Sequence, residues 1–239
     1  MSNPLLPLHV ADVALTIDSQ KLLSGINLDV STNGITAILG HNGAGKSLLL
    51  RALHGLNKTS SGTITWGGQS IEMARHRQSM VFQKPVLLRR SVAANIDYVL
   101  NLPIAQPKQT RDELLQLARL SDKARQPART LSGGEQQRLA FVRALATGPS
   151  IMLLDEPTAN LDPDATLWIE NLIDTAASRS IKMILVTHDL AQARRLAEDV
   201  IFIRNGSVEE HTDSSRFFTQ PSSIHSRSFI DGVLTGSAV

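Results

Sequence analysis

Short apolar runs alternate with helix-like patterns through most of the chain. The runs at residues 35–39, 151–154 and 183–186 have the length and composition of strands buried on both faces of a sheet. Helical patterns follow them, at residues 48–56, 163–178 and 190–196. This alternation is typical of a parallel sheet with crossover helices, so we expect an α/β fold.

Two stretches depart from this alternation. Near the N-terminus, residues 8–17 and 25–30 predict strands of a separate small sheet, which residues 62–66 join. Residues 86–150 are mainly helical, and Asn205-Gly206 predicts a hairpin turn near the end. The expected helices of this region are 92–101, 111–120 and 135–146, with Pro103 and Pro107 separating the first two. We therefore expect one domain over residues 1–239, a helical subdomain at 86–150 within it, and a polar C-terminal tail at 222–239.

Composition narrows the class of protein. Of the 239 residues, 42% are hydrophobic and 19% charged, which is typical of a globular protein with a sizeable core. We expect no membrane span and no signal peptide, because no run approaches roughly 18 apolar residues and the start is not basic. The sequence has no cysteine, which excludes disulfides and fits a reducing compartment. A formal net charge of +2 does not favour extensive nucleic-acid binding.

A glycine-rich loop carries the first chemical signal. It reads Gly40-His41-Asn42-Gly43-Ala44-Gly45-Lys46-Ser47, with Leu48 opening the next helical pattern. Between a strand and a helix, this pattern predicts backbone N–H groups around phosphates, with Lys46 reaching the terminal phosphates and Ser47 binding magnesium. A plain glycine-rich turn is the alternative, and the flanking elements disfavour it.

A second loop, Leu131-Ser132-Gly133-Gly134-Glu135-Gln136-Gln137-Arg138, is the most informative stretch of the chain. It precedes a helical pattern, so free N–H groups, the helix dipole and the Ser132 hydroxyl would converge on one anion. The same residues also suit an ordinary helix start, with Ser132 as cap and Glu135 closing a capping box. Capping does not require Gly133-Gly134, so we favour a phosphate contact.

Asp155 and Glu156 end the apolar run at 151–154. Carboxylates at the carboxyl end of a buried parallel strand lie at the edge where open α/β sheets bind ligands. We expect Asp155 to hold magnesium through water and Glu156 to polarise the attacking water or accept its proton. A solvated strand end is the alternative, which the two preceding motifs disfavour.

Taken in order, these motifs resemble those of the ATP-binding cassette (ABC) family, whose signature sequence is the second loop. The resemblance extends from about residue 8 to about residue 221. It implies a P-loop NTPase (RecA-like) core, an N-terminal antiparallel β subdomain and an inserted helical subdomain that carries the signature. The implied cofactors are ATP and Mg²⁺.

The resemblance also implies roles for four further residues. Gln83 matches a glutamine that couples the nucleotide and its magnesium to a partner protein, and Asp162 lies in a loop that contacts the opposite subunit. His188 matches a switch histidine that contacts the terminal phosphate. Ile17 stands where the family usually has an aromatic residue that stacks on adenine, so we expect weaker base discrimination.

The partners are implied by the same resemblance. Two cassettes would pair head to tail as a homodimer, each lending Ser132, Gly133 and Gly134 to the other's terminal phosphate. ATP would close the dimer and hydrolysis would reopen it. Transmembrane permease subunits and an extracytoplasmic solute-binding protein would complete the complex. The chain would then lie peripherally on the cytoplasmic face of the inner membrane.

Three classes of function share parts of these motifs. For transport, residues 85–90 offer an apolar patch beside Arg89 and Arg90 where a permease helix would dock, although this patch also suits the start of the helical subdomain. ATPases acting on nucleic acid resemble tandem cassettes or cassettes with long insertions, which this sequence lacks, and P-loop kinases lack the signature. Residues 80–95 and 228–232 resemble ATPase subunits of bacterial oxyanion importers, particularly the tungstate type. Import of phosphate, molybdate or another solute, and export, stay open.

Overall fold

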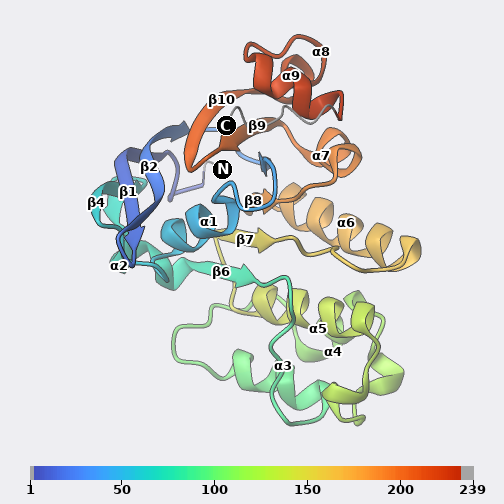
Figure 1. The fold of residues 1–239 in the computed structure, drawn as a ribbon. Helices are drawn as coiled ribbons and strands as arrows, with labels where there is room; N and C mark the ends of the chain where they lie inside the picture. Colours follow the sequence, from blue (N-terminus) through green and yellow to red (C-terminus); the bar gives the residue numbers. More distant parts are fainter. Residues whose placement is uncertain (1–2, 233–239) are drawn as a thin grey trace.

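The computed structural model of the protein describes residues 3–232. This part of the chain forms a six-stranded sheet and a four-stranded sheet, with helices packed around them (Figure 1). The strand order is β10-β9-β3-β8-β7-β6 in the larger sheet and β2-β1-β4-β5 in the smaller. The α/β fold predicted from the alternation of apolar runs and helices is therefore confirmed.

The larger sheet is parallel except at one edge. Its parallel strands are β3 (Ile35–Leu39), β6 (Gln78–Val81), β7 (Ile151–Asp155), β8 (Lys182–Val186) and β9 (Asp199–Arg204). The edge strand β10 (Ser207–Asp213) pairs antiparallel with β9 through the predicted turn at Asn205-Gly206. Parallel strands place their carboxyl ends together, so the segments that follow β3, β6, β7 and β8 meet at one edge.

The smaller sheet is antiparallel throughout. Its strands are β1 (Leu8–Ile17), β2 (Gln20–Val30), β4 (Ser61–Trp66) and β5 (Gln69–Ser70). The predicted strand at 25–30 is too short, because β2 begins at Gln20, directly after a two-residue turn in which Asp18 and Ser19 have positive φ.

Nine α-helices lie among the described residues. They are α1 (Lys46–His54), α2 (Ile71–Ala74), α3 (Val92–Leu100), α4 (Arg111–Leu117), α5 (Gly133–Ala146), α6 (Pro163–Ser178), α7 (Leu190–Leu196), α8 (Ser214–Thr219) and α9 (Ile224–Ile230). None of them is long and apolar enough to cross a membrane. The helix predicted at 48–56 starts earlier and ends before the left-handed Gly55, and the one predicted at 111–120 ends before Arg119, which has a φ of 52°.

Strand β7 separates two hydrophobic cores. Its side chains alternate between the faces of the sheet. Met152 and Leu154 pack with α3, α4, α5 and α6, whereas Ile151 and Leu153 pack with α1 and the smaller sheet. Helices α1 and α5 consequently lie on opposite faces of the larger sheet (Figure 1).

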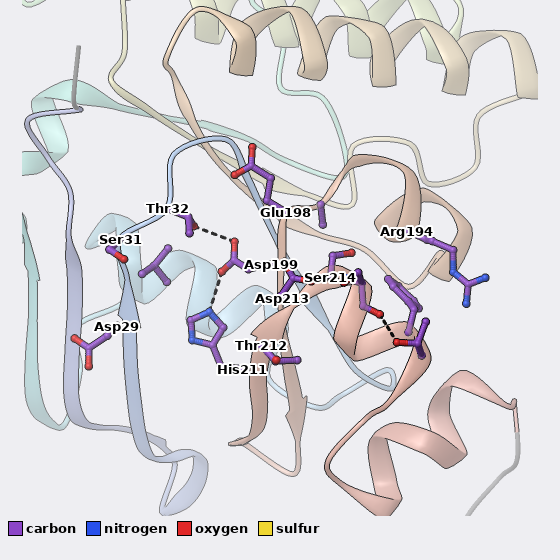
Figure 2. A pocket seen from close by; sticks show the side chains of 15 residues that line it. Asp29, Ser31, Thr32, Arg194, Glu198, Asp199, His211, Thr212, Asp213 and Ser214 are labelled. Atoms are coloured by element: carbon purple, nitrogen blue, oxygen red, sulfur yellow. Dashed lines mark hydrogen bonds and ion pairs between the residues drawn. The ribbon is translucent and has the colours of Figure 1, made fainter.

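A buried polar cluster lies at the amino-terminal edge of the parallel strands. The wholly buried Lys182 donates to Thr36 Oγ1 at 2.7 Å, and Thr36 Oγ1 donates in turn to Asp199 Oδ1 at 2.7 Å. His211 Nε2 lies 2.8 Å from Asp199 Oδ2. Asp199 and His211 line a pocket of about 980 Å³ beside Thr32, which donates to Asp199 (Figure 2). This pocket is at the opposite edge of the sheet from the ends of β3, β7 and β8.

The cluster predicts an unusual pH dependence of stability. Burial lowers the pKa of Lys182 to about 8, although Asp199 and Glu198 act in the opposite direction. Because the unfolded lysine titrates near 10.4, the folded protein binds fewer protons between about pH 8 and pH 10, and this contribution to the free energy of unfolding rises with pH.

We expect the free energy of unfolding of the wild type, relative to that of Lys182→Met, to increase by up to about 3 kcal/mol as the pH rises from 8 to 10. Urea denaturation at each pH measures the difference, and Lys108→Met, at an exposed lysine, is the matched control. A difference that does not change over this range would show that the buried amine keeps an ordinary pKa.

Candidate functional site

The glycine-rich loop, residues 40–47, connects β3 to α1 in a conformation that excludes side chains at two positions. A Cβ at Gly40, where φ is 152°, would lie 2.2 Å from the Ile203 carbonyl oxygen. A Cβ at Gly45, where φ is 103°, would lie 2.8 Å from Leu23 Cδ2. Gly45 is the N-cap of α1 and makes no side-chain cap, so the first N–H groups of the helix are available to an anion.

Lys46 is a buried cation at the centre of this loop. Its ammonium donates to the carbonyl oxygens of Gly40 at 2.8 Å and His41 at 3.0 Å, and the residue is 5% exposed. Burial lowers the pKa of Lys46, while the charges of Glu156 and Asp155 oppose that shift. The lysine therefore stands between the loop and two carboxylates, where it can balance the charge of a phosphate group.

Ser47 and Asp155 form an oxygen pair suited to magnesium. Ser47 Oγ donates to Asp155 Oδ1 at 2.6 Å, and the other carboxylate oxygen lies 3.7 Å from an Arg51 nitrogen. Among residues 3–232, no group of three His, Asp or Glu side chains could hold a metal ion by itself. A hydroxyl and one carboxylate fit Mg²⁺, which takes few protein oxygens and completes its shell with water and substrate phosphate.

Glu156 brings together two other predicted residues. Its backbone has a φ of 45°, an uncommon left-handed conformation directly after β7. Gln83 Nε2 donates to Glu156 Oε2 at 3.2 Å, and His188 Nδ1 lies 3.2 Å from the same oxygen. Segments after β6, β7 and β8 thus place an amide, a carboxylate and an imidazole at one point of the sheet edge.

The signature loop, residues 131–138, forms the capping box that the sequence suggested as an alternative. Ser132 Oγ accepts from the Glu135 N–H at 3.4 Å, and Glu135 Oε2 accepts from the Ser132 N–H at 2.9 Å. Glu135 also contacts Lys123, and this hydrogen bond lowers the pKa of Glu135. Leu48 lies in α1 and packs against the hydrophobic core that contains Ile151 and Leu153.

The two glycines of the signature loop have different surroundings. A Cβ at Gly134 would lie 2.8 Å from Ala165 Cβ of α6, so packing alone requires glycine there. A Cβ at Gly133 would meet nothing within 4 Å. The helix start at Gly133 is therefore open to an approaching anion, in addition to being capped.

The glycine-rich loop and the signature loop each lead into a helix, and these two helices lie on opposite faces of the sheet. Helix α1 packs against β7 and β8, whereas α5 packs against β6 and α6. Asp162 is the N-cap of α6, and its Oδ1 accepts from the Ala165 N–H at 2.8 Å. The contacts described above bring Lys46, Ser47, Gln83, Asp155, Glu156 and His188 together within one chain. Ser132, Gly133 and Asp162 take part in none of these contacts.

Ile17 lies at the end of β1, opposite Gln20, and is 47% exposed. The same hairpin continues into Leu22 and Leu23, which approach Gly45 of the glycine-rich loop. An exposed aliphatic side chain is thus carried by the strand pair that borders this loop.

Sequence reasoning missed three contacts that support the site. Gly206 accepts from the Ser24 N–H at 2.8 Å and donates to the Ala44 carbonyl at 3.0 Å, which ties the β9–β10 turn to the loop. The ring of Phe229 in α9 lies 5.0 Å from that of His41, edge to face. Arg51 beside Asp155 is the third. The sequence Asn205-Gly206 predicts a turn, but no sequence pattern indicates that Gly206 contacts Ala44.

Comparisons with known proteins agree with this geometry. The model of the ABC transporter family matches residues 23–159. The chain is 37% identical to phosphate import ATP-binding protein PstB 2 of Natronomonas pharaonis, over 95% of this chain and 87% of the relative. The chain belongs to the ABC transporter family.

Other relatives in the family give the same picture. Phosphate import ATP-binding protein PstB 2 of Bacillus subtilis is 32% identical, over 94% of this chain and 91% of that protein. The solved structure of cbiO1 from Clostridium perfringens, part of the ABC transporter complex cbiONQ, is 28% identical with a TM-score of 0.77, over 92% of this chain and 94% of that one. Family membership confirms the P-loop NTPase fold and makes the chain an ATPase.

Ile17 leads to a prediction about the nucleotide base. We expect kcat/KM for ATP and GTP to differ by less than about tenfold, and Ile17→Tyr to raise kcat/KM for ATP by about fivefold, since stacking of the base contributes roughly 1 kcal/mol. Steady-state hydrolysis of both nucleotides measures the ratio. Ile17→Val, which keeps an aliphatic side chain, is the control, and a wild-type enzyme with strong ATP preference would contradict the expectation.

Proposed function

We propose that this protein is the ATP-hydrolysing subunit of an ABC importer for a tetrahedral oxyanion. The observation that carries the hydrolytic role is the meeting of Gln83, Glu156 and His188 beside the Ser47–Asp155 pair. The two PstB 2 relatives named above are phosphate import ATP-binding proteins, and they support the cargo class.

The residues at the sheet edge have separate roles in hydrolysis. The N–H groups of residues 43–47 and the Lys46 ammonium bind the phosphates and neutralise their charge. Ser47 and Asp155, with Gln83 nearby, would hold Mg²⁺, which would neutralise further negative charge on the phosphates. Glu156 orients the attacking water and takes up its proton, while His188 contacts the terminal phosphate.

A complete site needs a second copy of the chain. The open Gly133 N–H and the Ser132 hydroxyl would complete the partner's phosphate site, and Asp162 would lie in the loop that meets the partner. This division fits the position of α1 and α5 on opposite faces of the sheet. ATP joins the two copies, and hydrolysis releases them.

A groove beside Gln83 supports coupling to a membrane permease. It has a volume of about 460 Å³ and lies between β6, α3 and α5, where Met80, Phe82, Val86 and Tyr98 give it an apolar lining. Val86 is 72% exposed, and its carbonyl accepts from Arg143 at 2.7 Å. A helix of a permease subunit in this groove would sense the position of Gln83, and the chain would then lie on the cytoplasmic face of the inner membrane.

Other subunits would recognise the transported solute, because the site described above binds ATP and not the solute. Phosphate is the cargo in the names of the relatives, and the local resemblance of residues 80–95 points to tungstate. Both are tetrahedral oxyanions, so the proposal names this class. An extracytoplasmic solute-binding protein would select between them, and nucleic acid has no part in the proposed complex.

Glu156→Gln tests the hydrolytic role. We expect ATP to bind with unchanged affinity, hydrolysis to fall about hundredfold or more because the general base is lost, and ATP to hold the protein as a dimer. Nucleotide binding, phosphate release and size-exclusion chromatography measure the three effects. Adding Gly133→Asp, which places a negative charge at the open helix start, should abolish the dimer. Normal turnover by Glu156→Gln would remove Glu156 from the mechanism.

The cargo class is tested on the complex purified with its permease and binding protein. We expect phosphate or tungstate to stimulate ATP hydrolysis several-fold in proteoliposomes, and a sugar, an amino acid or DNA to have no effect. Comparing phosphate, tungstate and molybdate identifies the solute. Copurification without any membrane protein, or stimulation by DNA alone, would overturn the proposed function.

A further inference from the structure

Four arginines surround a pocket that shares no lining residue with the permease groove, although Arg89 and Arg90 flank the apolar patch predicted to dock a permease. The pocket has a volume of about 380 Å³. Its lining consists of Arg89, Arg90, Ser91, Arg125, Pro127 and Arg129. Two guanidinium groups come from the segment before α3 and two from the segment before the signature loop. These segments are far apart in sequence, so the cluster is a product of the fold.

Backbone pairing holds the two segments in place. Ser91 and Pro127 form an antiparallel bridge. The Val92 N–H donates to the Gln126 carbonyl at 2.9 Å, and the Ala128 N–H donates to the Arg90 carbonyl at 2.9 Å. The two segments that carry the four arginines are therefore held together by this short ladder.

A buried asparagine fixes the segment that carries Arg89 and Arg90. Asn95 has no exposed surface. Its side chain accepts from the Leu88 N–H at 2.9 Å and donates to the Ser91 carbonyl at 2.9 Å, with a longer contact to the Arg90 carbonyl at 3.4 Å. A polar side chain satisfied in this way makes the segment rigid, and rigidity lowers the entropic cost of binding a ligand.

The positive charge of the pocket is not balanced by the protein. Within residues 3–232, none of the four guanidinium groups forms an ion pair with a carboxylate. The chain as a whole is nearly neutral, with 24 basic and 22 acidic residues. Four unpaired charges of one sign around a small pocket repel one another and attract a compact anion.

We propose that this pocket binds the phosphate group of an anionic ligand. Guanidinium groups present N–H pairs that match phosphate oxygens two at a time, and several of them can bind one phosphate from different sides. The pocket volume is at the lower end of the range for small-molecule sites, which suits a single phosphate-bearing group. Two sources have this chemistry: the headgroup of an anionic lipid and a soluble phosphate compound.

The position of the pocket relates it to the permease groove without overlapping it. The Arg90 guanidinium lies 5.8 Å from the ring centre of Tyr98, which lines the groove, and the two cavities share no residue. An acidic segment of a partner protein is the competing occupant. The small volume favours a compact phosphate over an extended peptide.

The test uses the full chain saturated with Mg-ADP, so that the glycine-rich loop is filled in every measurement. The probes are phosphatidylcholine vesicles with and without phosphatidylglycerol, inorganic pyrophosphate, and a polyglutamate peptide. The test variant is Arg125→Gln with Arg129→Gln. The control is Arg216→Gln with Arg227→Gln, which removes the same charge from exposed arginines of α8 and α9. ATP hydrolysis, measured in parallel, reports folding and the nucleotide site separately.

We expect the wild type and the control variant to bind phosphatidylglycerol vesicles or pyrophosphate, and the test variant to bind about tenfold or more weakly, since charge-assisted hydrogen bonds are lost. Vesicle binding alone identifies a lipid headgroup, and pyrophosphate binding identifies a soluble ligand. The inference is overturned if neither probe binds, if the control variant weakens binding equally, or if only polyglutamate binds. Because hydrolysis is measured separately, these outcomes leave the proposed function untouched.

Discussion

The conformation of the glycine-rich loop is the constraint on which the site depends. The loop has no room for a side chain at Gly40 or Gly45, because Ile203 of β9 and Leu23 of β2 approach those positions. Gly206, in the turn after β9, is hydrogen-bonded both to Ser24 of β2 and to Ala44 of the loop itself. Both sheets therefore contact one loop and fix its conformation, with Lys46 buried inside it.

Charged side chains lie close to the glycine-rich loop at the edge of the larger sheet. Lys46 is a buried cation next to Asp155 and Glu156, so the edge is nearly balanced before a nucleotide with its magnesium arrives. Glu156 follows β7 in a left-handed conformation, and its carboxylate contacts side chains that follow two other strands. In the proposed complex, a partner that moved Gln83 would act on the proposed catalytic carboxylate through this one hydrogen bond.

Much of the fold could be predicted because buried parallel strands and their helices have strong periodic patterns. The boundaries that were wrong, at Gln20, Lys46, His54 and Leu117, lie within two residues of positions with positive φ, which side-chain patterns do not reveal. The convergence of Lys46, Asp155 and Glu156 follows from strand order, so it could be expected from the motifs. The contacts of Gly206 with Ala44 and of Phe229 with His41 join residues remote in sequence, and a single sequence contains no signal for such pairs. The roles of Ser132, Gly133 and Asp162 toward a second chain, and tungstate as cargo, stay predictions.

We propose that the glycine-rich loop of one copy and the signature loop of another form one ATP site. The chain has no cysteine, so Asn42→Cys with Ser132→Cys provides the sole thiols of a Glu156→Gln protein. Oxidation in the presence and absence of ATP, followed by non-reducing electrophoresis, measures the link directly. We expect an ATP-dependent covalent dimer that neither single-cysteine variant forms. A disulfide within one chain, or no ATP-dependent dimer, would contradict it.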